Sequence, residues 1–406
     1  MQILVVNSGS SSIKLRLVDV AENTQRTPAS QEPLVKVSIN GIGGIATFES
    51  TGRIASPATD RLEIRDHAHA FRILFKRLAG ALNGIEAVGH RVVHGGDQYV
   101  EATMITDQVE AGIDSLSELA PLHNPACLAG IHGVREVFGS RVPMVAVFDT
   151  AFHQTMPKVA KHYALQTEMA DRHRIRRYGF HGIAHASLAN GYAACTGTAL
   201  DRVRLITLQL GNGCSACAIA GGRSIDTSMG FTPLEGLVMG TRSGDVDPSV
   251  VSYLSDREKV EAVEVERWLN GQSGLLGLSG RSNDMREVLR AAEQQDNRAM
   301  FAIDLFCYRA RKYLGAYLAA LNGADAIIFG GGIGENAPDI RERICRDMEW
   351  CGLTLDPDRN CGAVGLSPGH GALISADQSR PAAYVVAADE ETWIAMETAR
   401  CVRGLP

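Results

Sequence analysis

One pattern occurs twice in this chain, as ILVVNSGSSSIKL at residues 3–15 and as LITLQLGNGCSACAI at residues 205–219. Each copy begins with an apolar, β-branched run, turns through glycine and small polar residues, and continues into a second run, as strand-turn-strand units do. Gly9 of the first copy corresponds to Gly211 of the second. The copies lie about 200 residues apart, roughly one domain length, so the pattern predicts two related domains.

A third glycine-rich stretch, AIIFGGGIGEN at residues 326–336, combines a buried-strand pattern with a loop of glycines. Because glycine has no Cβ atom, such a loop can adopt positive φ and bring backbone N–H groups close to a phosphate or nucleotide. One loop alone more often marks a hairpin or a strand end. Two matched copies and a third loop favour a nucleotide site.

The composition narrows the class of protein. A chain of 406 residues is too long for one ordinary core, and 45% hydrophobic with 21% charged residues is typical of a globular protein. A net charge of -6 argues against a general nucleic-acid binder. No stretch approaches the roughly 20 apolar residues of a membrane span, and the N-terminus lacks a signal-peptide pattern. We therefore expect a cytoplasmic protein with neither nucleic-acid nor membrane partners.

The nine cysteines are scattered and odd in number, which fits a reducing compartment better than a disulfide-built fold. Cys214 and Cys217 form the only close pair in the sequence. They lie in a predicted strand without a second pair or a nearby histidine, so we expect neither metal binding nor redox use.

Strands alternate with helices along the chain, which predicts the α/β class. The apolar spacing predicts helices at residues 67–82, 106–119, 127–137 and 391–402, and strands at 85–93 and 142–148. We expect a first domain of residues 1–152 with 385–406, completed by the returning last helix, and a second domain of residues 153–384 with the nucleotide site.

Transfer of a phosphoryl group requires groups that neutralise the charge on the transferred oxygens, usually Arg, His, backbone N–H and Mg²⁺. Such candidates stand where strands end or loops turn, namely Arg91, Asp149, His181, Asn212, Arg242 and Glu390. Singly, each has an ordinary structural explanation. An isolated arginine is usually solvated or ion-paired, Asp245 or Asp247 is an available partner for Arg242, and His181 is plausible as a hydrogen-bonded loop histidine.

Seven motifs together make a stronger case: NSGSSSIK at 7–14, HRVVHGG at 90–96, FDTAFH at 148–153, RYGFHG at 177–182, LGNG at 210–213, MGTRSGDVDP at 239–248 and GIGEN at 332–336. In order and spacing they resemble the acetate kinase family, over essentially the whole chain. One motif can arise by chance, but seven in order are highly specific.

The resemblance implies two related ribonuclease H-like domains of the actin-like ATPase type, each a mixed five-stranded sheet flanked by helices, with an interdomain cleft. It implies reversible, Mg²⁺-dependent transfer of the ATP γ-phosphoryl group to acetate, directly and in line, giving acetyl phosphate and ADP and linking acetate to acetyl-CoA metabolism. Mn²⁺ is an alternative metal, and a homodimer is implied.

The resemblance also assigns roles by position. Arg91 and Arg242 would clamp the carboxylate and the transferring phosphoryl group, which His181 and Asn212 would hydrogen-bond. Asp149 would position Mg²⁺ or orient its waters.

Further groups of residues are assigned in the same way. The metal group is Asn7 and Glu390, and the apolar pocket for the acetate methyl group is Val93, Leu122, Phe180 and Pro233. The nucleotide group comprises Ser10, Ser12 and Lys14 in the first phosphate loop, Gln209, Gly211, Asn212 and Gly213 in the second, and Asp284, Met285, Arg286, Gly332, Ile333, Gly334 and Asn336 around the adenosine.

The implied chemistry suits this inventory. Acetate is already an anion at neutral pH, so the reaction needs no strong general base. It needs in-line positioning and screening of two anions that repel each other, which two arginines and a metal supply. One methylene changes discrimination by only about 1–3 kcal/mol, so a propionate or other short-chain carboxylate kinase is an open alternative.

Two further alternatives are less favoured. An actin-like or Hsp70-like ATPase switch has no need for Arg91, Arg242 and an apolar pocket. A pyrophosphate-linked enzyme has no need for an adenosine pocket, for which Ile333 and Asp284 are intact.

The chain departs from the family pattern at two positions. Gln209 stands where the family usually carries histidine, and a glutamine amide donates a hydrogen bond but cannot become cationic. We expect weaker transition-state stabilisation from this change. Asp389 stands where the family usually has asparagine, and we expect a conservative exchange at a helix cap rather than an added charge at the metal.

Overall fold

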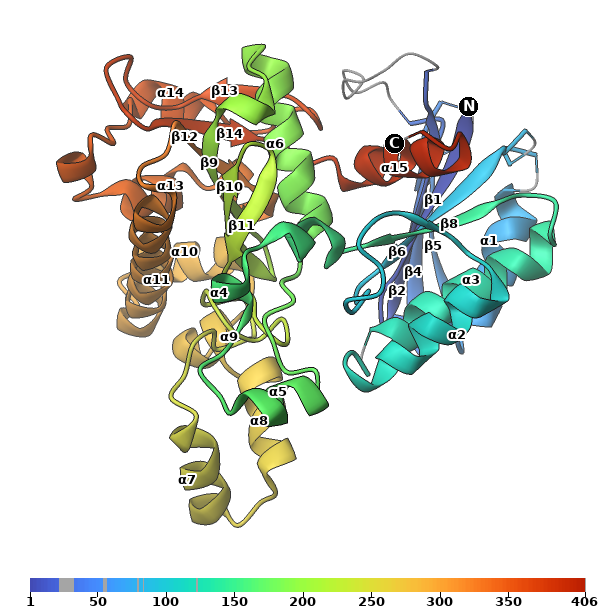
Figure 1. The fold of residues 1–406 in the computed structure, drawn as a ribbon, viewed down its shortest axis with the longest axis horizontal. Helices are drawn as coiled ribbons and strands as arrows, with labels where there is room; N and C mark the ends of the chain where they lie inside the picture. Colours follow the sequence, from blue (N-terminus) through green and yellow to red (C-terminus); the bar gives the residue numbers. More distant parts are fainter. Residues whose placement is uncertain (22–32, 54–56, 79, 83, 122, 406) are drawn as a thin grey trace. The chain divides into compact units, whose positions relative to one another are not determined.

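The computed structural model describes the chain apart from residues 22–32, 54–56, 79, 83, 122 and 406 (Figure 1). It contains two compact units, Met1–Gln154 with Asp389–Pro406 and Thr155–Ala388. Leu122, expected in the acetate pocket, lies outside the described residues.

The first unit is built on an eight-stranded sheet in the order β5-β4-β3-β2-β1-β6-β8-β7. Central β1 pairs antiparallel with β2 and parallel with β6, and β6 pairs parallel with β8. The strands are β1 (Gln2–Ser8), β2 (Ser12–Asp19), β3 (Val35–Asn40), β4 (Gly44–Thr51), β5 (Ala58–Ile64), β6 (Ala87–Val92), β7 (Thr103–Met104) and β8 (Met144–Phe148).

Helices cover both faces of this sheet, which is why its central strands are apolar almost throughout. On one face, Val88 of β6 joins the apolar core formed with α1 and α3. On the other, Gly89 lies against Thr398 and Ile394 of α15, where a Cβ atom would come within 2.3 Å of the Thr398 hydroxyl. The helices are α1 (His67–Leu78), α2 (Asp107–Ser115), α3 (Asn124–Phe138) and α15 (Glu390–Val402).

All four helices differ from the expected bounds, α15 by a single residue at its start. The first ends at Leu78 rather than at residue 82, the second ends at Ser115 rather than at 119, and the third begins at Asn124 rather than at 127. Pro125 occupies the first turn of α3, where the missing N–H group is not needed for a helical hydrogen bond.

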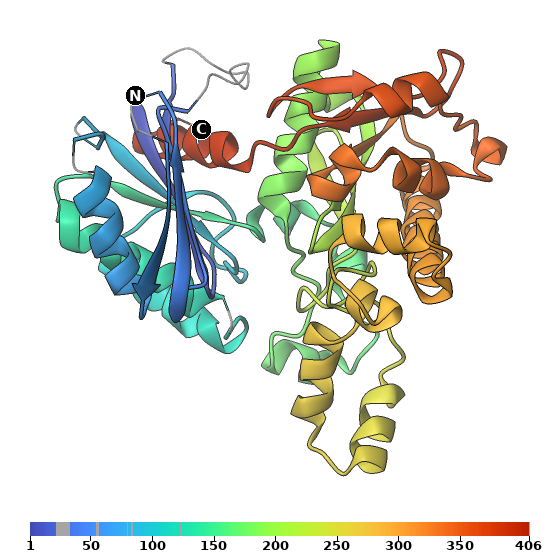
Figure 2. The same cartoon turned by 180° about the vertical axis from the view of Figure 1, so that it is seen from behind.

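The second unit contains a six-stranded sheet in the order β11-β10-β9-β12-β14-β13. Helix α6 packs on one face of this sheet and α11 on the other (Figure 1, Figure 2). The strands are β9 (Arg204–Leu210), β10 (Cys214–Ala220), β11 (Arg223–Thr227), β12 (Ala326–Gly330), β13 (Gly371–Leu373) and β14 (Ala382–Val386).

Eleven α-helices are described in this unit. They are α4 (Lys158–Lys161), α5 (Thr167–Arg172), α6 (Gly182–Thr196), α7 (Ser249–Glu258), α8 (Ala262–Gly271), α9 (Gly274–Ser279), α10 (Met285–Glu293), α11 (Asn297–Leu321), α12 (Gly331–Asn336), α13 (Pro338–Cys345) and α14 (Pro357–Gly362). Short 3₁₀ helices occur along the chain at Leu116–Glu118, Ala151–Thr155, Leu200–Arg202 and Glu349–Cys351. Over the residues with described positions, no helix is both long and apolar enough to cross a membrane.

The two sheets repeat one topology. Strands β3-β2-β1-β6-β8-β7 of the first correspond in order and direction to β11-β10-β9-β12-β14-β13 of the second. The predicted α/β duplication is therefore confirmed. The expected five strands per sheet are wrong, because β4 and β5 prolong the first antiparallel meander and the very short β7 and β13 add an antiparallel edge to each sheet.

Candidate active site

In the first unit, three neighbouring strands bring Asn7, Arg91 and Asp149 together. Asn7 lies near the end of β1, Arg91 near the end of β6, and Asp149 directly after β8. Because β1, β6 and β8 run parallel, their carboxyl ends meet at one edge of the sheet, where ligand sites of α/β folds lie. The Nε atom of Arg91 donates to both carboxylate oxygens of Asp149 at 3.1 and 3.2 Å, and its Nη1 donates to Oδ1 of Asn7 at 3.2 Å.

Charge is concentrated at this edge. Burial disfavours the charged form of Arg91, but the Asp149 carboxylate outweighs burial and holds the pKa of Arg91 above its ordinary value. Burial also raises the pKa of Glu390, at the start of α15, to about 7; Arg91 opposes this rise and Asp149 adds to it. The carboxyl groups of Asp149 and Glu390 therefore both interact electrostatically with Arg91.

The oxygen donors of Asn7, Asp149 and Glu390 are of the kind that Mg²⁺ takes. Across the described part of the chain, no group of three or more His, Cys, Asp or Glu residues is arranged to hold a metal. Mg²⁺ commonly uses only one or two carboxylates and completes its shell with phosphate oxygens and waters. The residues present thus fit an ion that is bound mainly through a nucleotide.

Asp389 belongs to a helix cap, as the sequence predicts. Its carboxylate accepts hydrogen bonds from the backbone N–H and the hydroxyl of Thr392, at 3.2 and 2.7 Å, in the first turn of α15. Nη1 of Arg16 lies 2.6 Å from the same carboxylate, which is buried. The additional charge at this position is therefore paired with Arg16.

The first phosphate loop is the tight turn between β1 and β2. The N–H of Gly9 donates to the carbonyl of Ser12 at 2.8 Å, and a ring nitrogen of His67 lies 2.7 Å from the carbonyl of Gly9. Ser10 and Lys14 are exposed and Ser12 is half-buried. His67 braces the turn from the first residue of α1, a contact that the sequence pattern did not reveal.

In the second unit, a cavity of about 470 Å³ lies beside the second phosphate loop. Eight of the expected nucleotide residues line it, namely Gly211, Asn212, Asp284, Met285, Arg286, Gly332, Ile333 and Asn336. Asn283, Leu289 and Ala337 also line it and were missed. The position of Leu289, one helical turn after Met285 on α10, was the available signal. Gln209, Gly213 and Gly334 are not among the lining residues.

A buried arginine, Arg341, stabilises α12, the helix that contributes Gly332, Ile333 and Asn336 to this cavity. Nη1 of Arg341 donates to the carbonyls of Gly334 and Glu335, at 2.9 and 3.0 Å, near the end of α12. Its other nitrogens bind the side chain and backbone of Asn360. These carbonyls lack partners within the helix, so Arg341 satisfies them and fixes α12 in place.

The loop that carries Arg242 packs against the second phosphate loop. The N–H of Gly240 donates to the carbonyl of Asn212 at 2.9 Å, and a Cβ atom at position 240 would come within 2.1 Å of the Asn212 side-chain oxygen. That oxygen accepts a hydrogen bond from Nδ2 of Asn283 at 2.9 Å. Glycine at 240 is therefore necessary for the observed position of Asn212.

Arg242 and His181 both border Gly213. A Cβ atom at position 213 would lie 3.2 Å from Nε2 of His181 and 3.7 Å from Nη1 of Arg242. Nη1 of Arg242 donates to the carbonyl of Pro233 at 3.0 Å, and burial lowers the pKa of Arg242. Within the described residues no carboxylate forms an ion pair with Arg242, and Asp245 instead binds Arg309.

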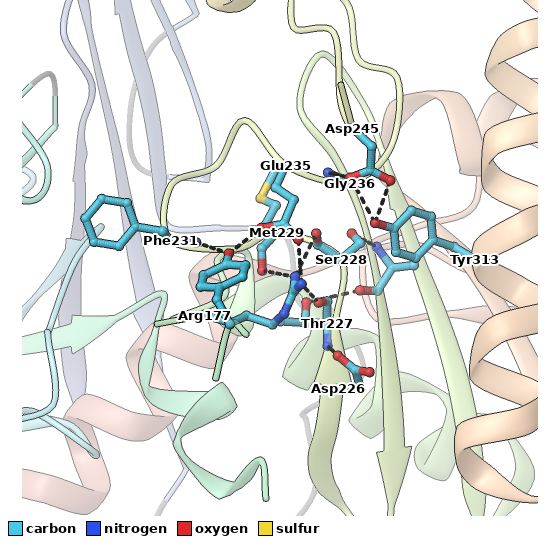
Figure 3. A network of polar contacts seen from close by, with 12 residues as sticks. Arg177, Asp226, Thr227, Ser228, Met229, Phe231, Glu235, Gly236, Asp245 and Tyr313 are labelled. Carbon is cyan, nitrogen blue, oxygen red and sulfur yellow. Dashed lines mark hydrogen bonds and ion pairs between the residues drawn. The ribbon is translucent and has the colours of Figure 1, made fainter. Parts of the chain in front are cut away.

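A polar network anchors the segment that carries Pro233 and Arg242 (Figure 3). Arg177 donates to three successive carbonyls, those of residues 227–229, at 2.9 to 3.1 Å and pairs with Glu235 at 2.5 Å. Further along, Asp245 accepts from the N–H of Gly236 at 2.8 Å and from the hydroxyl of Tyr313. Sequence reasoning found Arg177 only as the first letter of a motif, because its role depends on contacts distant in sequence.

His181 has an unusual backbone conformation, with φ 58° at the N-terminus of α6. Non-glycine residues in this left-handed region are uncommon, and they cluster at functional sites. Next to it, Phe180 is buried, whereas Pro233 is half-buried. Val93 belongs to the first unit and is half-buried. The acetate pocket expected from these residues stays a prediction.

Gln209 lies on β9, paired with Ser215 on β10 and with Gly330 on β12. Its side-chain oxygen is buried and has no hydrogen-bond partner among the residues that the structure describes. The position is thus next to the second phosphate loop, as expected, and its amide is not fully satisfied.

Comparison with known proteins places this geometry in context. A model of the acetokinase family matches residues 2–396. The chain is 48% identical to an acetate kinase of Solibacter usitatus, with 100% of this chain and 99% of the relative covered, and 46% identical to one of Chloroherpeton thalassium, with 99% of both covered. Among solved structures, an acetate kinase of Porphyromonas gingivalis has a TM-score of 0.89 at 37% identity over 99% of both chains. A propionate kinase of Francisella tularensis has a TM-score of 0.90 at 39% identity over 100% of both chains.

Proposed function

The chain belongs to the acetokinase family, and from this we propose that it transfers the γ-phosphoryl group of ATP to acetate, reversibly and with Mg²⁺. An acetate oxygen would attack the γ-phosphorus in line while the bond to the β,γ-bridging oxygen breaks, so that acetyl phosphate and ADP form without a proton transfer. The observation that carries the proposal is Arg242, a half-buried cation with no carboxylate partner among the described residues, beside a phosphate loop that borders a nucleotide-sized cavity.

Each half of the proposed machinery has a distinct task. Arg242, His181 and Asn212 would donate hydrogen bonds to the transferring phosphoryl group, in which negative charge is spread over three oxygens. Arg91, fixed in orientation by Asp149, would bind an anionic oxygen with its remaining N–H groups. Mg²⁺, held through Asn7, Asp149 and Glu390 or their waters, would offset phosphate charge.

The same family assignment leads us to propose a cytoplasmic homodimer, in which the two actin-like domains span residues 1–152 with 385–406 and 153–384. A second candidate function is phosphorylation of propionate or another short-chain acid. It is supported by the likeness to a solved propionate kinase, and one methylene is worth only about 1–3 kcal/mol in an apolar pocket.

The test is an assay of the purified protein with Mg-ATP and acetate, in which hydroxylamine traps acyl phosphate as the hydroxamate. We expect hydroxamate and ADP in equal amounts, and kcat/KM for C2 to C4 acids decides between the two candidates. ADP without hydroxamate for any acid would instead identify an ATPase, and no turnover at all would reject a kinase.

A further inference from the structure

A continuous chain of hydrogen bonds leads from His181 into the core of the second unit. Nδ1 of His181 lies 2.9 Å from the hydroxyl oxygen of Ser215, which lies 2.8 Å from Nε2 of His185. Nδ1 of His185 lies 2.7 Å from the hydroxyl oxygen of Thr207. His181 is half-buried, whereas His185, Ser215 and Thr207 have no exposed surface.

The fold accounts for this alignment. His181 is the N-cap of α6, and its carbonyl accepts the N–H of His185 at 2.9 Å, so both side chains lie at the same end of the helix. In the β9–β10 pair, Cys217 is opposite Thr207 and Ser215 is opposite Gln209, so the Thr207 and Ser215 side chains share one face of the sheet. Helix α6 packs on that face and completes the chain.

The number of protons limits the chain to two arrangements. The Ser215 hydroxyl has one hydrogen, so it donates to one of the two histidines and accepts an N–H from the other. Each nitrogen of His185 lies within hydrogen-bond distance of a hydroxyl oxygen, and a neutral ring with one N–H satisfies both contacts without burying a charge.

In one arrangement, Thr207 donates to His185, His185 donates from Nε2 to Ser215, and Ser215 donates to Nδ1 of His181. A neutral His181 then carries its proton on Nε2. In the reverse arrangement, His181 donates from Nδ1, and the Nε2 of a neutral His181 is bare.

Nε2 of His181 is the nitrogen beside Gly213 of the second phosphate loop. Only a protonated Nε2 can donate a hydrogen bond to an anion there. We propose that the buried chain of Thr207, His185 and Ser215 holds His181 as the Nε2–H tautomer, with its N–H directed at the phosphate loop. These three are positioning residues. The chain alone is compatible with either direction, so the choice of the Nε2–H tautomer and its benefit to phosphoryl transfer both rest on the proposed function, whereas the measurement of the tautomer needs no turnover.

The tautomer is tested on the whole protein without substrates, labelled with ¹⁵N-histidine, by long-range ¹H–¹⁵N correlation of the imidazole rings. Loss of signals in His181→Asn assigns one ring, and the shifts caused by Ser215→Ala identify the ring of His185. We expect both rings to be neutral and protonated at Nε2. A proton on Nδ1 of His181, or a cationic His185, would overturn the proposal.

The consequence for catalysis is tested with Ser215→Ala, which interrupts the chain. Loss of a hydrogen-bond partner that orients a metal-bound histidine typically costs about 10- to 100-fold in activity, and we expect a loss of this size in kcat here, with KM for ATP changed less than about two-fold. Thr207→Val should cause a smaller loss that Thr207→Ser restores. Ser224→Ala removes another fully buried serine hydroxyl of the same sheet, outside the chain, and is the matched control.

The proposed function and the positioning role give different results when they are wrong. If wild-type protein forms no hydroxamate, the proposed function is wrong, and the imidazole spectrum still decides the tautomer. If the enzyme is active but Ser215→Ala matches wild type in kcat, or loses no more than Ser224→Ala, the positioning role is wrong.

Discussion

Arg91 and Arg242 are the same type of side chain with the same proposed ligand class, yet the two units hold them in opposite ways. Arg91 is bound at two points by the Asp149 carboxylate and contacts Asn7. Arg242 is oriented by the neutral carbonyl of Pro233, and burial lowers its pKa because no described carboxylate compensates its charge. The first arginine thus stabilises its own unit, whereas the second keeps its charge available for an anion.

The difference extends to the surroundings. The first unit gathers Asp149 and Glu390 near its arginine, so it has negative charge with which to attract a metal. The second unit uses ion pairs away from the site, such as Arg177 with Glu235, to anchor the segment that presents Arg242. Beside Gly213, the second phosphate loop therefore faces the Arg242 cation and the His181 ring, with no carboxylate paired to Arg242 among the described residues.

The largest expected effect is on catalysis by Arg242→Ala. Loss of one preorganised donor to transition-state charge typically costs 10²–10³-fold, about 3–4 kcal/mol, and a cation without a competing carboxylate should be at the upper end. Measured as kcat/KM by hydroxamate formation, we expect a fall of about 10³-fold, partly restored by added guanidinium. Arg242→Lys keeps the charge but lacks the planar guanidinium, so its kcat/KM should lie between those of wild type and Arg242→Ala. A fall below ten-fold would show that Arg242 is not the anion ligand.

The next largest effect is a difference in the free energy of unfolding between Arg91→Ala and Arg242→Ala. Arg91→Ala leaves the buried Asp149 carboxylate without its partner, and breaking such a pair costs about 3–5 kcal/mol when it is fully buried. Because the Arg91 side chain is 22% exposed, we expect about 3 kcal/mol in the free energy of unfolding, against less than about 1 kcal/mol for Arg242→Ala. Urea unfolding of both variants without ligands measures this difference. Equal losses would erase the distinction, and Asp149→Asn in the Arg91→Ala background should recover part of the stability.

A smaller effect concerns pH. The pKa of Glu390 in the folded protein, about 7, is above the ordinary 4.5, mainly because of burial. Folding therefore favours the protonated carboxyl, so this contribution is complete below pH 4.5 and is lost as the pH rises through 7. A pKa difference of one corresponds to about 1.4 kcal/mol. We expect the unfolding free energy without Mg²⁺ or nucleotide to fall more steeply between pH 5 and 8 in wild type than in Glu390→Gln.

Glu391→Gln is the matched control for this slope, because Glu391 is the next residue of α15 but lies 3.8 Å from Arg16 and its side chain is 30% exposed. Because burial raises the pKa of Glu390 more than the Glu391 charge does, the control should keep most of the wild-type slope. Parallel curves for wild type and Glu390→Gln would show that this carboxyl group is not desolvated in the folded protein.

The sequence predicted those features of the two units that depend on short local patterns. The repeated strand-turn-strand units and the motifs at strand ends indicated the duplication, Arg91, Asp149 and Arg242. The strand count implied by the resemblance was wrong, because β4 and β5 extend the first sheet and β7 and β13, of two and three residues, add an edge too short to show any period.

The contacts that distinguish the two arginines were not predictable in this way. Whether Arg242 pairs with Asp245 depends on Arg309 and Tyr313, which lie on α11 more than sixty residues later. Likewise, nothing in the sequence marks His185 or Ser215, because the hydrogen bond between them forms only when α6 packs on the sheet. Local patterns place functional groups on elements, whereas only packing decides which charges are already paired.

The smallest expected effect is that of Gln209→His, which adds a titratable side chain next to the second phosphate loop. Gln209 is paired with Ser215 next to the second phosphate loop, and its buried side-chain oxygen has no partner among the described residues, so the wild-type amide contributes less than a full set of hydrogen bonds. An imidazolium there would add a cation near the transferring phosphoryl group, and a partly screened charge interaction is worth about 0.5–1 kcal/mol. We expect kcat to rise about two- to five-fold, with a new dependence on pH between about 6 and 7, where histidine titrates. Gln209→Asn keeps a neutral amide and should leave the pH profile unchanged. If kcat and the pH profile of Gln209→His both match wild type, the second unit does not depend on added charge at this position, and Arg242 with neutral donors suffices.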